Sequence, residues 1–157
     1  MSQEYNTAPN ATLPMGWHKF LIYFSLWASA LFCVVTGIMT FSGSHYGGYA
    51  QEMYAIFGGM RAVDIAFGLI WIAIGAYAVL TRFALARFRK GASQKLTVLY
   101  GANVAANVLY MILASSVIGV SLWGEMDGSS YSSLAVSIVM IFVNRAYYAK
   151  RASMFAE

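Results

Sequence analysis

Residues 20–41 read FLIYFSLWASALFCVVTGIMTF, and the chain carries no charged side chain between Lys19 and Glu52. An α-helix crosses a hydrocarbon core about 30 Å thick with roughly 20 apolar residues. The stretch is therefore long enough for one transmembrane pass, and it exceeds the roughly 7–15 apolar residues of a signal-peptide core. We expect a retained first span over about residues 18–41.

The rest of the chain repeats this pattern three times. Further uncharged stretches cover residues 65–81, 96–124 and 128–144. They predict spans over about residues 61–81, 96–122 and 129–148. The last span is the weakest, because it is short and opens with the serine-rich SSYSSLAVS. Arg145 and Lys150 can extend it by reaching toward the lipid heads.

The composition favours the same architecture. Of the 157 residues, 60% are hydrophobic and 10% are charged, against about 25% charged in an ordinary soluble domain. This composition excludes a water-soluble globule. We predict an all-α fold, with a four-helix transmembrane bundle over residues 16–157 and a flexible polar tail with both prolines over residues 1–15.

Basic residues lie almost entirely on one side of this topology. Arg61 is alone on one side, and the other nine of the ten are Lys19, Arg82, Arg87, Arg89, Lys90, Lys95, Arg145, Lys150 and Arg151. Basic residues accumulate on the cytoplasmic side of a membrane. We therefore expect both termini in the cytoplasm, in a bacterial cytoplasmic membrane. Anionic lipid heads, not nucleic acid, are the expected partner of the net charge of +4.

Small residues recur along one face of the first span. The stripe consists of Ser25, Ser29, Cys33 and Gly37. A spacing of four aligns these residues on a helix, and membrane helices pack through small residues that let their backbones approach. We predict that this stripe is a helix-packing face.

Arg61 and Asp64 are three residues apart at the entrance of the second span, in GGMRAVDIAFG. That spacing allows an ion pair on a helix, and we interpret it first as a structural pair that sets the helix register. Asp64 is also the one acidic residue placed to lie inside the hydrocarbon, where ionisable groups mark functional sites by default. A proton- or cation-coupled mechanism would have to use it.

Asn103 and Asn107 form the most polar stripe within any predicted span. They are four residues apart in YGANVAANVLY and share a helix face, near Tyr100 and Tyr110. We interpret them first as interhelical hydrogen-bonding groups, and alternatively as the lining of a small cavity.

The chain lacks the residues of common metal and cofactor sites. Cys33 is the single cysteine, which excludes an intrachain disulfide and a cysteine-rich metal site. His18 and His45 lie at opposite ends of the first span, about 40 Å apart along a helix, so one haem cannot join them. We expect no metal, no cofactor and two interfacial histidines.

The first connection, residues 42–59, is rich in glycine and aromatic residues. Glycines open and close it, and glycine pairs favour turns. We expect a short helix within YAQEMYAIF that lies on the membrane face. It caps a cavity, contacts a partner or serves only as a connection.

Three segments carry a resemblance. With its GWHKFLIYFSLWAS opening, GGMRAVDIAFG entrance and VSIVMIFVNRAYYAKR ending, the sequence resembles small four-helix bacterial membrane proteins over most of residues 14–154. The resemblance implies the architecture alone, and no functional residue is carried over from it.

Function follows mostly by exclusion. No nucleotide-binding glycine motif, metalloprotease motif or catalytic triad is found, and the segments outside the spans are too small for a catalytic domain. We expect a non-enzymatic protein that acts by protein or lipid contacts, as an accessory, immunity or stress protein. The alternative is a small oligomeric transporter or channel for an ion or small molecule, built on Asp64, Asn103 and Asn107. A second copy or another membrane protein is the expected protein partner.

Overall fold

The computed structural model describes residues 14–125 and 128–155, so nearly all of the expected tail over residues 1–15 lies outside it. The described residues form helices and connections without a strand, and four helices are long and apolar enough to cross a membrane. The predicted all-α architecture with four candidate spans is therefore confirmed, and it is the architecture of a multi-pass membrane protein.

The first span is built from three pieces that follow one another without a break. They are α1 (Gly16–Phe20), the π-helical turn η1 (Leu21–Ser25) and α2 (Leu26–Ser42). The first connection then forms the 3-10 helix η2 (Ser44–Tyr49) and the expected short helix, α3 (Ala50–Ile56). The other three spans and two short 3-10 turns are α4 (Met60–Ala86), α5 (Ala92–Ile118), η3 (Leu122–Glu125), α6 (Gly128–Ala149) and η4 (Ala152–Phe155).

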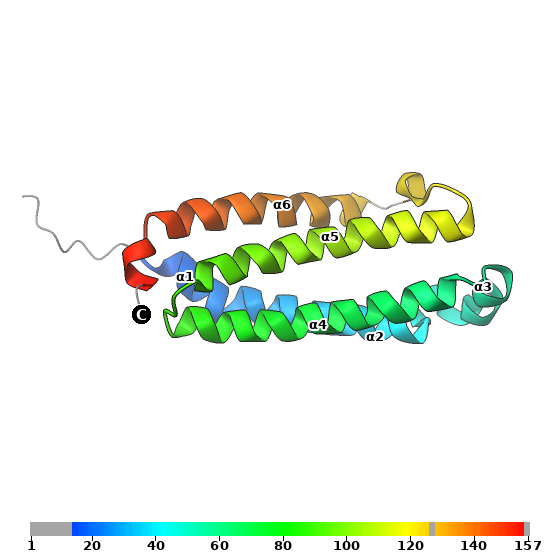
Figure 1. Cartoon of the computed structure of the whole chain (residues 1–157), viewed down its shortest axis with the longest axis horizontal. Helices are drawn as coiled ribbons and strands as arrows, with labels where there is room; N and C mark the ends of the chain where they lie inside the picture. Colours follow the sequence, from blue (N-terminus) through cyan, green and yellow to red (C-terminus); the bar gives the residue numbers. More distant parts are fainter. Residues whose placement is uncertain (1–13, 126–127, 156–157) are drawn as a thin grey trace, which may run out of the picture.

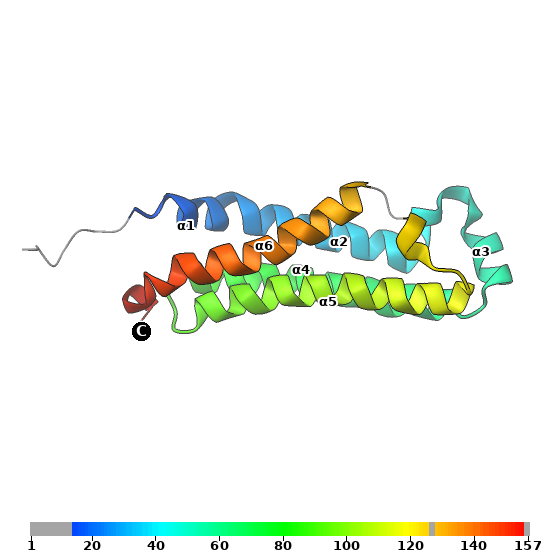
Figure 2. The same ribbon diagram turned by 90° about the horizontal axis from the view of Figure 1, so that it is seen from above.

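The helices run side by side along the long axis of the molecule, with α2 beside α4 and α5 beside α6 (Figure 1). The short helix α3 lies at one end, while α1 and the C-terminal turn lie at the other (Figures 1 and 2). We name these the Asp64 end and the His18 end, each after one of its buried polar residues. Ten described basic side chains divide between them as the sequence predicts, with Arg61 alone at the Asp64 end.

Glycines bring α2 and α4 into close contact. A Cβ atom added to Gly37 would lie 2.7 Å from the Gly68 carbonyl oxygen, and one added to Gly75 would lie 3.0 Å from the Ala30 carbonyl oxygen. Such short distances leave no room for a side chain. Gly37 and Cys33 of the predicted packing stripe are buried at this contact, whereas Ser25 and Ser29 are half-buried.

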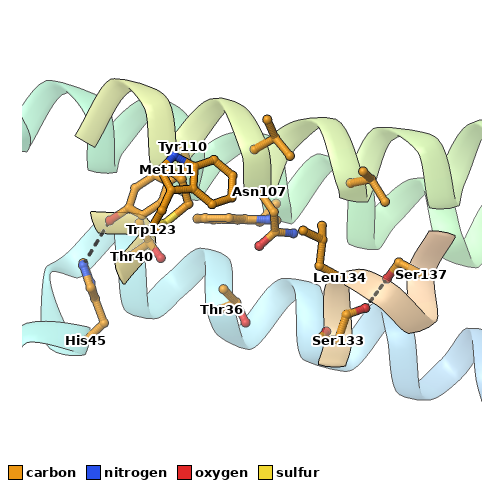
Figure 3. Close-up of a pocket in the computed structure, with 13 residues that line it drawn as sticks. Thr36, Thr40, His45, Asn107, Tyr110, Met111, Trp123, Ser133, Leu134 and Ser137 are labelled. Carbon is orange, nitrogen blue, oxygen red and sulfur yellow. Dashed lines mark hydrogen bonds between the residues drawn. The ribbon is translucent and has the colours of Figure 1, made fainter. Parts of the chain in front are cut away.

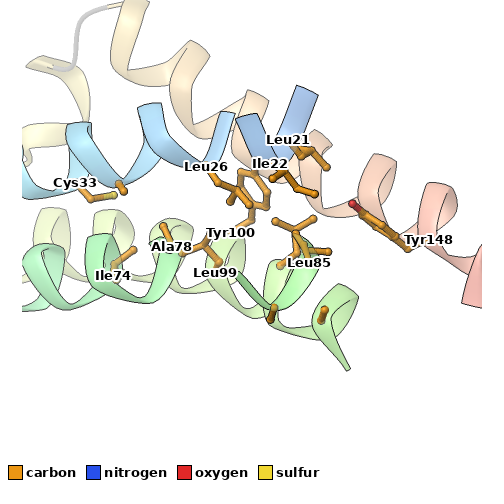
Figure 4. Packing of buried hydrophobic residues seen from close by; sticks show 14 of the residues in the cluster. Leu21, Ile22, Leu26, Cys33, Ile74, Ala78, Leu85, Leu99, Tyr100 and Tyr148 are labelled. Atoms are coloured by element: carbon orange, nitrogen blue, oxygen red, sulfur yellow. The ribbon is translucent and has the colours of Figure 1, made fainter. Parts of the chain in front are cut away.

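The main apolar core lies toward the His18 end (Figure 4). Its fully buried leucines come from three spans and are Leu21, Leu26, Leu85, Leu96 and Leu99. Membrane helices gain little from apolar burial itself, because lipid is equally apolar. Dense packing here therefore stabilises the bundle chiefly through close van der Waals contact.

Candidate functional site

Asp64 is fully buried in the second turn of α4, at the Asp64 end of the bundle. The Tyr54 hydroxyl of α3 donates a hydrogen bond of 2.9 Å to its Oδ2 atom. The Tyr110 hydroxyl of α5 donates one of 3.0 Å to its Oδ1 atom. Both carboxyl oxygens thus accept from neutral phenols, an arrangement that suits the ionised carboxylate because hydrogen bonds to a charged acceptor are the stronger ones.

His45 of η2 lies beside this carboxylate. Its Nε2 atom is 3.9 Å from Asp64 Oδ2 and 3.5 Å from the Tyr110 hydroxyl, while its Nδ1 atom is 3.2 Å from the Met39 carbonyl oxygen. A carbonyl only accepts, so the proton of a neutral ring belongs on Nδ1, and Nε2 is the atom that can gain a proton facing Asp64. The His45 side chain is 26% exposed, which connects the buried carboxylate to the solvent.

Gly43 allows the chain to adopt the turn that this arrangement requires. It ends α2 with a φ of +77°, in the left-handed region where glycine is favoured. A Cβ atom at this position would lie 2.5 Å from the Tyr54 hydroxyl oxygen. The missing side chain therefore both turns the chain toward His45 and leaves space for Tyr54 to reach Asp64.

The ion pair that we expected between Arg61 and Asp64 is replaced by other contacts. The Arg61 guanidinium lies over the Tyr54 ring, 5.1 Å from its centroid, and Nη1 donates to the Phe41 carbonyl oxygen at 3.5 Å. The expectation was wrong because spacing alone does not determine side-chain direction. Asp64 points into the bundle, whereas Arg61 stays exposed.

A cavity of about 490 Å³ adjoins the cluster and is lined from all four spans (Figure 3). Tyr110 and His45 are part of both the wall and the Asp64 cluster. The other described wall residues are either uncharged polar or apolar. They are Thr36, Thr40, Trp71, Val104, Asn107, Val108, Met111, Trp123, Ser133, Leu134 and Ser137. A space of this size is typical of a small-molecule site.

The two asparagines have different positions. The Asn103 amide lies 3.7 Å from Cys33 Sγ, so it connects α5 to α2 as an interhelical contact. The Asn107 amide nitrogen donates to the Asn103 carbonyl oxygen at 2.9 Å, within α5, and the side chain lines the cavity. Asn103 thus lies at a contact between two helices, whereas Asn107 lies in the cavity wall.

The His18 end is closed by contacts between the first span and α6. Trp17 Nε1 donates to Asn144 Oδ1 at 3.0 Å, and His18 Nδ1 lies 2.9 Å from the Tyr148 hydroxyl. His18 is 3% exposed and Asn144 is 1% exposed, so both side chains are buried against other helices at this end. Aromatic neighbours cover both side chains. Trp17 contacts Asn144, and the His18 ring is stacked on Phe88.

Sequence reasoning identified Asp64, Asn103 and Asn107 as candidates but missed His45 and Tyr54. Their signal was the unusual composition of residues 42–59, which carry both side chains. Among the described residues, no group of three or more His, Cys, Asp or Glu side chains is placed to hold a metal ion.

Comparison of the chain with protein-family models, curated proteins and solved structures finds no match.

Proposed function

We propose that this protein is a small membrane transporter that couples the movement of a small solute to protons at the Asp64 cluster. The observation that carries the proposal is a fully buried carboxylate beside a cavity of about 490 Å³. Ionisable groups inside a membrane bundle are costly and mark ion, proton or substrate paths. Among our expectations, the geometry therefore favours the transporter over a protein that acts only by contacts.

Proton exchange at this cluster would involve few groups. Among the described residues, the titratable or charged side chains around Asp64 are Tyr54 from α3, Tyr110 from α5, His45 and Tyr46 from η2, and Arg61 from α4. His45 is the partly exposed member whose ring faces the carboxylate. It can take a proton from solution on Nε2 and balance the charge of Asp64, or release the proton when another cation takes its place.

The two ends of the bundle support a mechanism in which access alternates. At the Asp64 end the cavity lies between the four spans, whereas at the His18 end the Trp17–Asn144 and His18–Tyr148 contacts join the first span to α6. His18 Nε2 and Asn144 Nδ2 are buried there without a hydrogen-bond partner among the described residues.

Charge asymmetry supports an orientation. With nine of ten basic residues at the His18 end, the positive-inside rule places that end and both termini in the cytoplasm. The Asp64 end, where the cavity lies, is then the outer end in a bacterial cytoplasmic membrane. The non-enzymatic accessory, immunity or stress role, exerted through lipids, a second copy or a partner membrane protein, is the alternative proposal.

Transport can be tested with purified protein in lipid vesicles that contain a trapped pH-sensitive dye. Vesicles receive, one at a time, a quaternary ammonium ion, a zwitterionic betaine and a neutral sugar alcohol on the outside. We expect one of these probes to drive a proton flux that Asp64→Asn abolishes and that Glu52→Gln, an exposed carboxylate of α3, leaves intact. Equal proton flux in protein-free vesicles, or in Asp64→Asn, would favour the contact-based role.

A further inference from the structure

We infer that the cavity beside Asp64 binds a monovalent organic cation, an ammonium group with apolar substituents. The inference rests on the proposed function, in which this cavity is the solute site. The charge near the cavity, the residues of its wall and its size together indicate the class of solute.

The charge around the cavity favours a cation. Among the described residues that line the cavity there is no Lys, Arg, Asp or Glu, and the titratable ones, His45 and Tyr110, both contact the Asp64 carboxylate. Arg61 is turned away, onto the Tyr54 ring and the Phe41 carbonyl. In a medium of low dielectric constant the negative charge of Asp64 reaches into the cavity with little screening, so an anion would be repelled.

The wall supplies the groups that recognise an organic ammonium ion. Trp71, Tyr110 and Trp123 contribute aromatic rings, whose faces attract cations at distances up to about 6 Å. Hydroxyl and amide oxygens of Thr36, Thr40 and Asn107 line the same space and can accept hydrogen bonds from N–H groups. Figure 3 shows Trp123, Asn107 and Thr40 around one part of the cavity.

The size of the cavity argues against a bare metal ion. A volume of about 490 Å³ holds a small organic molecule. The described residues contain no group of three or more His, Cys, Asp or Glu side chains that could hold an ion. Substituents on the ammonium group are needed to fill the space between the aromatic rings.

Charge balance then links binding to a proton. Asp64 needs one positive charge nearby, and either His45 protonated on Nε2 or the bound ammonium ion can provide it. When the organic cation enters, the Nε2–H bond of the imidazolium breaks and the proton leaves to water at the Asp64 end. Among the described residues, the neutral phenols Tyr46, Tyr54 and Tyr110 and the Arg61 guanidinium surround this pair. One cation is therefore exchanged for one proton.

Calorimetric titration of the purified full chain in detergent tests this inference. The probe is benzyltrimethylammonium, which has no proton to lose, and the comparison compounds are neutral benzyl alcohol and anionic benzenesulfonate. We expect the cation to bind at least tenfold more tightly than either, and more tightly at pH 8 than at pH 5.5. Titrations below the midpoint of this dependence, in two buffers of different ionisation enthalpy, should show about one proton released per cation.

Two variants test separately whether binding requires the charge of Asp64 and the free volume of the cavity. Asp64→Asn should weaken cation binding at least tenfold, whereas Glu52→Gln, which removes the same charge from an exposed position, should not. Thr36→Phe fills the cavity from an exposed position of α2 and leaves the Asp64 contacts in place; it should also abolish binding. If Asp64→Asn does not fold, Thr36→Phe decides the result. Benzenesulfonate binding as tight as the cation, or cation binding unchanged in Thr36→Phe, would overturn the inference.

Binding and transport fail in distinguishable ways. A cation that binds in an Asp64-dependent manner but produces no flux in vesicles supports the ligand class and contradicts transport. An Asp64-dependent flux of betaine or sugar alcohol, without cation binding, supports transport and overturns the ligand class.

Discussion

A buried carboxylate held by tyrosines differs from one held by an arginine. The Tyr54 and Tyr110 hydroxyls satisfy the oxygens of Asp64 without cancelling its charge. An arginine at the same distance would have neutralised the site permanently, since a guanidinium stays protonated. In the proposed function the charge of Asp64 is therefore available to a cation that binds and leaves. His45, whose Nε2 atom is 3.9 Å from Asp64 Oδ2, is a neighbouring group that can supply a positive charge.

At the residue scale, His45→Gln tests this role. A glutamine amide can still donate to the Met39 carbonyl oxygen, which His45 Nδ1 contacts at 3.2 Å, but it cannot become a cation. We expect the affinity for benzyltrimethylammonium to lose its dependence on pH between 5.5 and 8 and to stay near the wild-type value at pH 8. Calorimetry at both pH values measures this. A dependence that persists in His45→Gln would assign the proton to another group.

Gly43 gives a second prediction at this scale. Gly43→Ala forces a β-carbon into the left-handed region, which costs about 1–2 kcal/mol, and brings it to within 2.5 Å of the Tyr54 hydroxyl. Gly119, which ends α5, has the same left-handed backbone, with φ +82° and ψ +8°, but has nothing within 4 Å of its Cβ position. Thermal unfolding in detergent should therefore show a larger loss for Gly43→Ala than for Gly119→Ala. Equal losses would mean that only the backbone strain matters and that Tyr54 has room to move.

The sequence predicts the buried carboxylate as a candidate site residue but does not predict the side chains that surround it. Asp64 was identified because an acidic residue at the edge of a span is rare. Its partners, Tyr54 and His45, come from a connection whose path depends on turns and on one helix of seven residues, which leave no hydrophobic periodicity. Spacing alone predicts Arg61 as the partner of Asp64. The burial of Asp64 and the exposure of Arg61 follow from the packing of α4, which spacing does not show.

At the element scale, the positions of the spans could be predicted, because uncharged apolar length decides them. The predicted first span over residues 18–41 corresponds to the helical run from Gly16 to Ser42. The π-helical turn Leu21–Ser25 inside it could not be predicted, since it depends on tertiary packing and not on composition. The buried side of each helix was also hard to predict, as lipid accepts the apolar residues that a soluble protein would hide.

The contact between α2 and α4 gives a prediction with a matched control. Gly37→Ala places a Cβ atom 2.7 Å from the Gly68 carbonyl oxygen, so the two backbones must move apart, at a cost of about 1–3 kcal/mol. Gly101→Ala on α5 meets nothing within 4 Å and should be neutral or slightly stabilising, because alanine favours helix more than glycine does. Unfolding midpoints in detergent compare the two. Similar midpoints would show that α2 and α4 are not held at this distance.

At the scale of the whole molecule, the two ends differ in charge and in closure. The His18 end gathers nine basic residues and joins the first span to α6, whereas the Asp64 end carries Arg61, Glu52 and the cavity. The charge difference was evident in the sequence. The closure was not, because it depends on Trp17 and His18 meeting Asn144 and Tyr148, residues more than 120 positions away.

The direction in which the molecule sits in the membrane is the last prediction. Positive-inside bias predicts that the His18 end lies in the cytoplasm. Matched exposed glutamines mark the two ends, Gln51 on α3 and Gln94 on α5. Each is replaced by cysteine in a Cys33→Ala background, and intact bacteria are treated with a membrane-impermeant maleimide. We expect labelling at position 51 in intact cells and at position 94 only after permeabilisation. The reverse pattern would place the cavity on the cytoplasmic side, so that the Asp64 cluster would exchange its proton with the cell interior.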